Sequence, residues 1–272
     1  MKTINDFFIL SNGVKIPVIG FGTWQIPDGK VAYDSVLFAL KAGYRHIDTA
    51  LAYGNEKSVG RAVRDSGIDR SEIFITSKLP AEIKSYDKAL RKYDETISNL
   101  DLGYIDLYLI HAPWPWNEKG ADYTKENKEV WRAMEEIYNG KNCRAVGVSN
   151  FNVKDMTAIL DTCTVKPMVN QIKYYIGYTE DDITWFCRSN NILVEGYSPL
   201  ATGRILANKE IDLLAKKYNR TLPQICIRYL IQHGVLPLPK SVTAERISEN
   251  FAVDFEITKE DMKYLDNLKE TV

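Results

Sequence analysis

Three apolar stretches of this chain each end in an ionisable residue. GYRHID ends at Asp48, IFITSK ends at Lys78 and IDLYLIH ends at His111, while Tyr53 follows Asp48 by five residues. Runs that are apolar at nearly every position predict strands buried on both faces of a sheet. Neighbouring strands lie about 5 Å apart, so we expect these four side chains to converge at one edge.

Side chains of these types can together deliver a proton. A carbonyl that accepts a hydride becomes an alkoxide, and a tyrosine with a pKa near 10 is a workable acid to protonate it. We expect the ammonium of Lys78 to lower the pKa of Tyr53, and Asp48 to keep Lys78 charged in a dry pocket. A ring N–H of His111 would polarise the carbonyl oxygen. Each of these residues alone could have an ordinary structural role, so the hypothesis of a proton-donating site depends on all four occurring together.

Eight apolar stretches alternate with amphipathic segments along the chain. After a short N-terminal hairpin with Ser11-Asn12-Gly13 as its turn, the candidate strands are VIGFGTW, HIDTA, IFITSK, IDLYLIH, AVGVSN, MVNQI, LVEGYSP and VLPLPKS. Eight strand–helix units predict an α/β fold, a (β/α)8 TIM barrel, which we expect to form one domain over residues 1–272. The rival doubly wound sheet would carry a GxGxxG loop, and Gly20-Phe21-Gly22 does not continue in that way.

Local signals predict where the helices begin and end. We expect an N-cap or capping box at each helix start and glycine at one helix end. The expected N-caps are Asn55, Ser85, Thr243 and Thr258 (with Asp261), the capping boxes are Thr179–Asp182 and Thr221–Gln224, and the stop is Gly140.

Composition excludes several function classes. The chain has 272 residues and a formal net charge of −1, which argues against a nucleic-acid or membrane-surface role. The N-terminus lacks the apolar core of a signal peptide, and no run approaches the roughly 20 apolar residues that span a bilayer. We expect a cytoplasmic protein, a monomer, with no metal in its site. Its cysteines are expected to be buried thiols: Cys143, Cys163, Cys187 and Cys226.

The chain resembles the aldo-keto reductase superfamily over nearly its whole length. The strings that carry the resemblance are GFGTW, GYRHIDTALAYGNEKSVGRAV, IFITSKL, YIDLYLIH, GVSNF, NQI, YSPL and LPKSVTAERISEN. The resemblance is to members with a short C-terminus, such as the 2,5-diketogluconate reductase-like carbonyl reductases. It implies that Tyr53 is the proton donor, that Asp48 and Lys78 support it, and that His111 orients a small-molecule carbonyl substrate.

A phosphate site is indicated near the last strand. Lys240 and Ser241 end that strand, and Thr243 opens a helix that contains Arg246. Two cations, a hydroxyl and helix N-terminal amides suit the 2′-phosphate of NADP(H).

The resemblance assigns the remaining cofactor contacts. Glu249 and Asn250 would contact the adenine, and Ser149, Asn150 and Gln171 the nicotinamide carboxamide. Tyr197 would stack on the nicotinamide ring. The other contacts implied for NADPH or NADP+ are Ser198 and Leu200 along the pyrophosphate, with Thr23 and Trp24 at the nicotinamide end. Gln171 and Tyr197 also have a purely structural interpretation, as a hydrogen-bonded core amide and a packed strand residue.

The substrate pocket is less sharply defined. The resemblance implies that Trp24, Tyr53, His111 and one tryptophan of the next loop enclose the carbonyl; we assign Trp114, although Trp116 or an anchoring role for both remains open. Here Ala112 follows His111, where the family usually has Trp-Pro, and Lys173 stands where the family often has glutamate. Little sequence remains after Asn250 to form a lid, so we expect an open pocket for small aldehydes, dicarbonyls and activated ketones.

Two other functions fit parts of the pattern. The chain could be an NADP-binding regulatory or sensor barrel with negligible turnover. Alternatively, Lys78 could be a Schiff-base nucleophile in an aldolase, although a lysine kept charged by Asp48 is a poor nucleophile.

Overall fold

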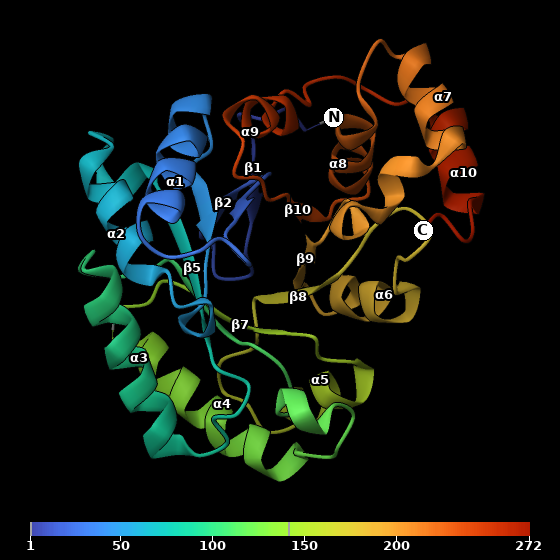
Figure 1. Cartoon of the computed structure of the whole chain (residues 1–272). Helices are drawn as coiled ribbons and strands as arrows, with labels where there is room; N and C mark the ends of the chain where they lie inside the picture. Colours follow the sequence, from blue (N-terminus) through green and yellow to red (C-terminus); the bar gives the residue numbers. More distant parts are fainter. Residues whose placement is uncertain (1, 141) are drawn as a thin grey trace.

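A computed structural model describes residues 2–140 and 142–272 of the chain (Figure 1). The N-terminal hairpin pairs β1 (Phe7–Ile9) with β2 (Lys15–Pro17) in antiparallel register. Its buried residues Phe8 and Ile16 pack with Phe74, Leu107 and Leu236, which begin three strands of the larger sheet. The hairpin therefore covers the amino ends of these strands and leaves the carboxyl ends open.

Eight parallel strands form the larger sheet in the order β10-β9-β8-β7-β6-β5-β4-β3. Backbone hydrogen bonds from Gly20 to Pro237 (3.0 Å) and from Gly22 to Pro239 (3.0 Å) join its two edges and close the barrel. The strands are β3 (Phe21–Gly22), β4 (His46–Asp48), β5 (Phe74–Leu79), β6 (Leu107–Ile110), β7 (Val146–Ser149), β8 (Val169–Lys173), β9 (Leu193–Tyr197) and β10 (Leu236–Leu238).

Helices surround this barrel, as Figure 1 shows. The α-helices are α1 (Lys30–Ala42), α2 (Glu56–Asp65), α3 (Tyr86–Leu100), α4 (Thr124–Asn139), α5 (Val153–Leu160), α6 (Asp181–Ser189), α7 (Lys209–Lys217), α8 (Leu222–Gln232), α9 (Ala244–Phe251) and α10 (Lys259–Asn267). Short 3-10 turns cover Leu51–Tyr53, Arg70–Glu72, Trp116–Glu118 and Ala201–Ala207. The prediction of a (β/α)8 barrel with an N-terminal hairpin is confirmed.

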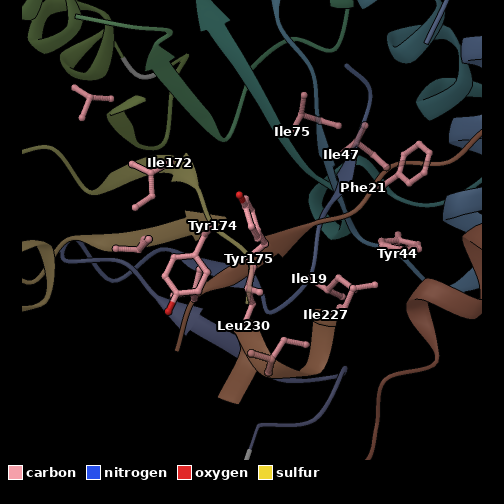
Figure 2. Packing of buried hydrophobic residues seen from close by; sticks show 14 of the residues in the cluster. Ile19, Phe21, Tyr44, Ile47, Ile75, Ile172, Tyr174, Tyr175, Ile227 and Leu230 are labelled. Atoms are coloured by element: carbon pink, nitrogen blue, oxygen red, sulfur yellow. The ribbon is translucent and has the colours of Figure 1, made fainter. Parts of the chain in front are cut away.

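The core lies between the strands and the helices. Ile47 of β4, Ile75 of β5 and Ile172 of β8 belong to a large buried apolar cluster that also contains helix residues such as Leu230 (Figure 2). The next residue along β4 after Ile47 is Asp48, which lines a cavity instead. This alternation follows from the two-residue period of a strand, which aims successive side chains at opposite faces.

The predicted caps and stop mark the helix boundaries correctly at every position except Thr179, although not all of them make the expected hydrogen bond. Thr221 and Gln224 form the predicted capping box of α8, and the amide of Asp261 donates to Thr258 at the start of α10. Helix α4 stops before Gly140 as predicted. The capping box at Thr179 is wrong: α6 starts from Glu180 in left-handed conformation (φ 46°), and the Thr179 hydroxyl donates to Asp181 instead.

Three predicted N-cap residues occupy the cap position without making the cap bond. Ser85 and Thr243 precede α3 and α9, but neither side chain accepts a cap hydrogen bond. Asn55 precedes α2, yet its amide bonds the carbonyls of Thr23 (3.1 Å) and Ile26 (3.0 Å). Asn55 therefore ties the loop after β3 to the loop after β4, close to Tyr53.

Among residues 2–140 and 142–272, no helix combines the length and the apolar character needed to cross a bilayer. All four cysteines are free thiols; Cys143, Cys187 and Cys226 are buried as expected, and Cys163 is partly exposed.

Candidate active site

The four predicted catalytic residues lie at the carboxyl ends of three neighbouring strands. Asp48 is the last residue of β4, Lys78 the second-last of β5, and His111 directly follows β6. Tyr53 ends the 3-10 turn after β4. The ladder pairs β4 with β5 and β5 with β6, so the fold places all four together.

A hydrogen-bonded chain connects Asp48, Lys78 and Tyr53. Lys78 is wholly buried, and its Nζ lies 2.7 Å from Asp48 Oδ1 and 3.4 Å from the Tyr53 hydroxyl. The ammonium also donates to the backbone carbonyl of Thr49 at 2.9 Å. Its three protons therefore have three acceptors, which is the full capacity of a lysine.

The charges in this chain support one another, but they do not lower the pKa of Tyr53. Burial acts most strongly and lowers the pKa of Lys78, but the charge and hydrogen bond of Asp48, together with Tyr53 and Glu195, outweigh burial and leave that pKa raised. Burial raises the pKa of Tyr53, and the opposing effect of the Lys78 charge is smaller. Lys78 therefore acts on Tyr53 in the expected direction, but the expectation of a net lowered tyrosine pKa is wrong for the free protein, because removing the phenolate from water costs more than one ammonium restores.

His111 is held neutral beside Tyr53. Burial, with a smaller contribution from the Lys78 charge, lowers the pKa of His111 to about 3. Its ring lies 5.5 Å from that of Tyr53 and 5.4 Å from that of Trp116, measured between centroids. A neutral imidazole carries one ring N–H, which can donate to a substrate oxygen.

A cavity of about 840 Å³ opens in front of these residues and extends across the barrel mouth. Most of the predicted cofactor residues line it, from both ends: Trp24, Ser149, Asn150, Gln171, Tyr197, Ser198, Leu200, Lys240, Ser241, Arg246, Glu249 and Asn250. Asp48, Tyr53 and His111 also line it, whereas Lys78 lies behind them. A volume in this range is typical of a pocket for a drug-sized or larger ligand.

Besides Lys78, three predicted residues lie outside the cavity wall. Thr23 is buried, and its hydroxyl donates to the carbonyl of Asp48 at 3.0 Å, so it supports that residue from behind. Thr243 donates its amide to Ser241 Oγ. The ring of Trp114 lies 5.3 Å from that of Trp116 between centroids, and of these two loop tryptophans Trp116 is the one that lines the cavity. Trp114, which we expected in the substrate wall, does not line the cavity, whereas Trp116, the alternative, does.

A polar network fixes the centre of the cavity. The Asn150 side chain donates to the carbonyl of His111 (2.9 Å) and accepts from the Tyr197 hydroxyl (2.8 Å). Asn150 has a φ of 62°, a left-handed conformation that asparagine tolerates better than most residues. Ser149 donates to the backbone carbonyl of Gln171 at 2.8 Å. These contacts fix the orientation of the Asn150 amide and of the Ser149 and Tyr197 hydroxyls.

The far end of the cavity is basic. Lys240 and Arg246 both line it and are exposed, and neither forms an ion pair with a carboxylate among the described residues. Glu249 instead accepts from the hydroxyl of Thr221 at 2.7 Å. Two cations without a counter-charge beside the start of α9 suit an anionic group.

Sequence reasoning missed Glu195. It lies on β9, is fully buried, and accepts from Gln171 Nε2 at 2.8 Å. The signal was present, since Glu195 is the one charged residue inside the apolar stretch LVEGY.

The described residues contain no group of three or more His, Cys, Asp or Glu side chains that could hold a metal ion.

Comparisons with known proteins agree with this geometry. The sequence model of the Aldo/keto reductase family matches residues 18–270. The chain belongs to the aldo-keto reductase family. It is 40% identical to the 9,11-endoperoxide prostaglandin H2 reductase of Trypanosoma cruzi, over 96% of this chain and 90% of that protein. It is 39% identical to the glyoxal reductase of Bacillus subtilis, over 98% of this chain and 94% of that protein.

A solved structure extends the comparison to three dimensions. The aldo-keto reductase of Bombyx mori, determined in complex with NADP, superimposes with a TM-score of 0.88 over 98% of this chain and 93% of that one, at 30% identity. This aldo-keto reductase is therefore an oxidoreductase that acts on carbonyl groups of small molecules.

Proposed function

We propose that this aldo-keto reductase reduces aldehydes and ketones with NADPH, and that Tyr53 donates the proton. The observation that carries the proposal is the buried Asp48–Lys78–Tyr53 chain, which meets His111 at one end of a cavity whose other end holds Lys240 and Arg246. The family membership supports the reaction class, and the NADP complex of the Bombyx mori enzyme supports the cofactor.

The donor set of the cavity fits a nicotinamide dinucleotide phosphate. Amide and hydroxyl groups of Ser149, Asn150 and Gln171 would hold the carboxamide, and the ring of Tyr197 would stack on the nicotinamide. Lys240 and Arg246 would bind the 2′-phosphate, since they have no carboxylate partner in the described chain. When bound, NADPH would supply the hydride.

The protein's own groups would manage the negative charge that develops on the substrate oxygen. A ring N–H of neutral His111 would hold that oxygen, and the hydroxyl of Tyr53 would protonate it. The raised pKa of Tyr53 keeps this proton in place until a strongly basic oxygen forms. Once the proton has moved, the phenolate of Tyr53 would remain 3.4 Å from the Lys78 ammonium, which would stabilise it.

The mouth of the cavity favours small or elongated carbonyl compounds. Trp24 and Trp116 both line it, and their side chains are 46% and 45% exposed, so the aromatic walls are open to solvent. We propose broad tolerance for small aldehydes, dicarbonyls and activated ketones. The name of the Bacillus subtilis relative, a glyoxal reductase, supports this substrate class.

The aldolase alternative conflicts with the state of Lys78. A Schiff-base lysine must be neutral to attack a carbonyl. Here Asp48, together with Tyr53 and Glu195, more than offsets burial and raises the pKa of Lys78, and all three ammonium protons are engaged.

The decisive experiment compares wild type with Tyr53→Phe. Wild type should consume NADPH in the presence of an activated aldehyde, followed at the absorbance of the reduced nicotinamide. Tyr53→Phe should lose turnover by at least about a hundredfold, because general acid catalysis contributes 10²–10⁴-fold, and should bind NADPH as wild type does. Undiminished turnover in Tyr53→Phe would refute the proton-donor role, and a wild type that retains NADPH without turnover would favour the sensor alternative.

A further inference from the structure

Glu195 presents a charge problem inside the barrel. Its side chain is fully buried on β9, and the nearby interior contains one ammonium, Lys78, for two carboxyl groups, Asp48 and Glu195. Lys78 is hydrogen-bonded to Asp48 and not to Glu195. If both carboxyls were ionised, the buried cluster would carry a net negative charge, which is costly away from water.

The hydrogen bonds indicate which carboxyl is neutral. Asp48 accepts from Lys78 through Oδ1 and from Gln171 through Oδ2. Glu195 accepts only from Gln171, through Oε2, and its Oε1 is buried with no hydrogen-bond partner. The ammonium of Lys78 therefore compensates a charge on Asp48 and not one on Glu195, so Glu195 is the carboxyl expected to hold the proton.

Among the residues that the structure describes, Lys78 is the one cation that acts on Glu195. Its partners in the adjacent strands are Gln171 on β8 and Leu236 on β10, and neither is charged. The charged groups that act on it are Asp48 on β4 and Lys78 on β5. Burial, and then the charge of Asp48, raises the pKa of Glu195 to about 8, so it passes from neutral to ionised in a mildly alkaline range.

Gln171 connects Glu195 to the proposed cofactor site. Both hydrogens of Gln171 Nε2 are directed at carboxyl oxygens, those of Asp48 and Glu195, each at 2.8 Å. This fixes the orientation of the amide and leaves Oε1 of Gln171 as the group that can accept from the nicotinamide carboxamide. Glu195 would therefore lie behind Gln171, one hydrogen bond further from the cavity than the proposed carboxamide contact.

We propose that Glu195 is a positioning residue that makes the choice between oxidised and reduced cofactor depend on pH. The nicotinamide ring of NADP+ carries a positive charge that NADPH lacks. Neutral Glu195 does not distinguish the two by charge, whereas ionised Glu195 attracts NADP+. Binding of NADP+ would thus release the proton of Glu195 to solvent, and alkaline pH favours NADP+ while acid pH favours NADPH. The inference rests on the proposed cofactor site.

The test measures binding without turnover. Dissociation constants of NADP+ and NADPH, from quenching of protein fluorescence, are compared at pH 6.5 and pH 9.0 for wild type and Glu195→Gln. In wild type the affinity for NADP+ relative to NADPH should rise about tenfold between these values, the effect of one buried charge at an effective dielectric constant near 20. In Glu195→Gln, which is neutral at both pH values, the ratio should stay near the wild-type value at pH 6.5.

Other titrating groups do not mimic this result. The 2′-phosphate titrates near pH 6 but is common to both cofactors, so it cancels in the ratio. Burial lowers the pKa of Lys84 to about 8, but any contribution of Lys84 would persist in Glu195→Gln. His111 and His46, with pKa values lowered by burial to about 3, do not titrate in this range.

A second measurement uses wild type alone and does not depend on how the variant folds. Calorimetry of NADP+ binding at pH 7.5 in two buffers of different ionisation enthalpy should show release of a substantial fraction of one proton, beyond that seen for NADPH. A wild-type ratio that is independent of pH, an equal pH dependence in Glu195→Gln, or equal proton release with both cofactors would overturn the role of Glu195. Failure of both cofactors to bind at either pH would overturn the cofactor site and this inference with it.

Discussion

Replacing Asp48 by Asn tests whether the buried ion pair is what keeps Lys78 charged. The Lys78 side chain is wholly buried, that of Asp48 is 5% exposed, and their closest atoms are 2.7 Å apart. Removing one partner of such a pair costs about 3–5 kcal/mol, because the remaining charge is left uncompensated. For a chain of this size, a loss of that order lowers the melting temperature by roughly 10 °C.

The pH dependence of this loss follows from the sign of the Lys78 shift. The pKa of Lys78 is raised in the folded protein, so its stabilising effect is present below the ordinary value of 10.5 and is lost as pH rises through the raised value. Asp48→Asn removes the main cause of the raised pKa. In the variant the effect of burial remains, so the pKa of Lys78 falls and the penalty for the unpaired charge lessens as pH rises through that lowered value. The stability difference between wild type and Asp48→Asn should therefore be largest near neutral pH and narrow toward alkaline pH.

A double variant separates stability from catalysis. Urea unfolding, followed by tryptophan fluorescence, should show that Asp48→Asn and Lys78→Met each lose stability, and that the double variant recovers at least half of either loss, because no unpaired charge remains. Turnover should be low in all three. The reasoning is refuted if Asp48→Asn unfolds at the wild-type urea concentration, or if the double variant is less stable than both single variants.

Three further changes test other parts of the structure. Arg246→Ala should weaken NADPH binding about ten- to a hundredfold, the value of a hydrogen bond to a charged group, and leave the weaker binding of NADH unchanged; fluorescence titration with both cofactors decides. Trp116→Ala should raise KM for aromatic aldehydes more than Trp114→Ala does in steady-state assays, since only Trp116 lines the cavity. Gly60→Ala should lower the free energy of unfolding in urea by about 2 kcal/mol or more, because a Cβ there would lie 1.9 Å from the Leu100 carbonyl oxygen. Gly140→Ala is the control and should leave that free energy nearly unchanged, since its Cβ would have its nearest contact at 3.5 Å.

The parts of the structure that sequence predicts well are those set by local pattern. Strands buried on both faces appear as apolar runs, and a polar residue at the end of such a run marks the barrel mouth. This is why Asp48, Lys78 and His111 could be grouped before any coordinates. The capping box at Thr221 was equally visible, because both of its hydrogen bonds lie within four residues.

The parts that sequence did not predict depend on contacts between distant segments. Gln171 contacts Asp48 across 123 residues of chain, so the partnership that defines the environment of Glu195 has no local signature. The choice of Trp116 over Trp114 depends on how the loop after β6 packs against His111. The raised pKa of Tyr53 is likewise a property of burial, which the types of its neighbours do not reveal.

The raised pKa of Tyr53 changes how the role of Lys78 should be understood. An ammonium that made the resting tyrosine acidic would favour loss of its proton before any substrate had bound. Here burial keeps Tyr53 protonated, and the charge of Lys78 acts most strongly on the phenolate, which exists only after the proton has moved. In the mechanism that we propose, the interaction would therefore be stronger late in the reaction than in the resting protein, and differential stabilisation of that kind accelerates a chemical step. Burial thus has the same effect on both groups: it raises the pKa of Glu195 and the pKa of Tyr53, and so favours the protonated form of each in the resting protein.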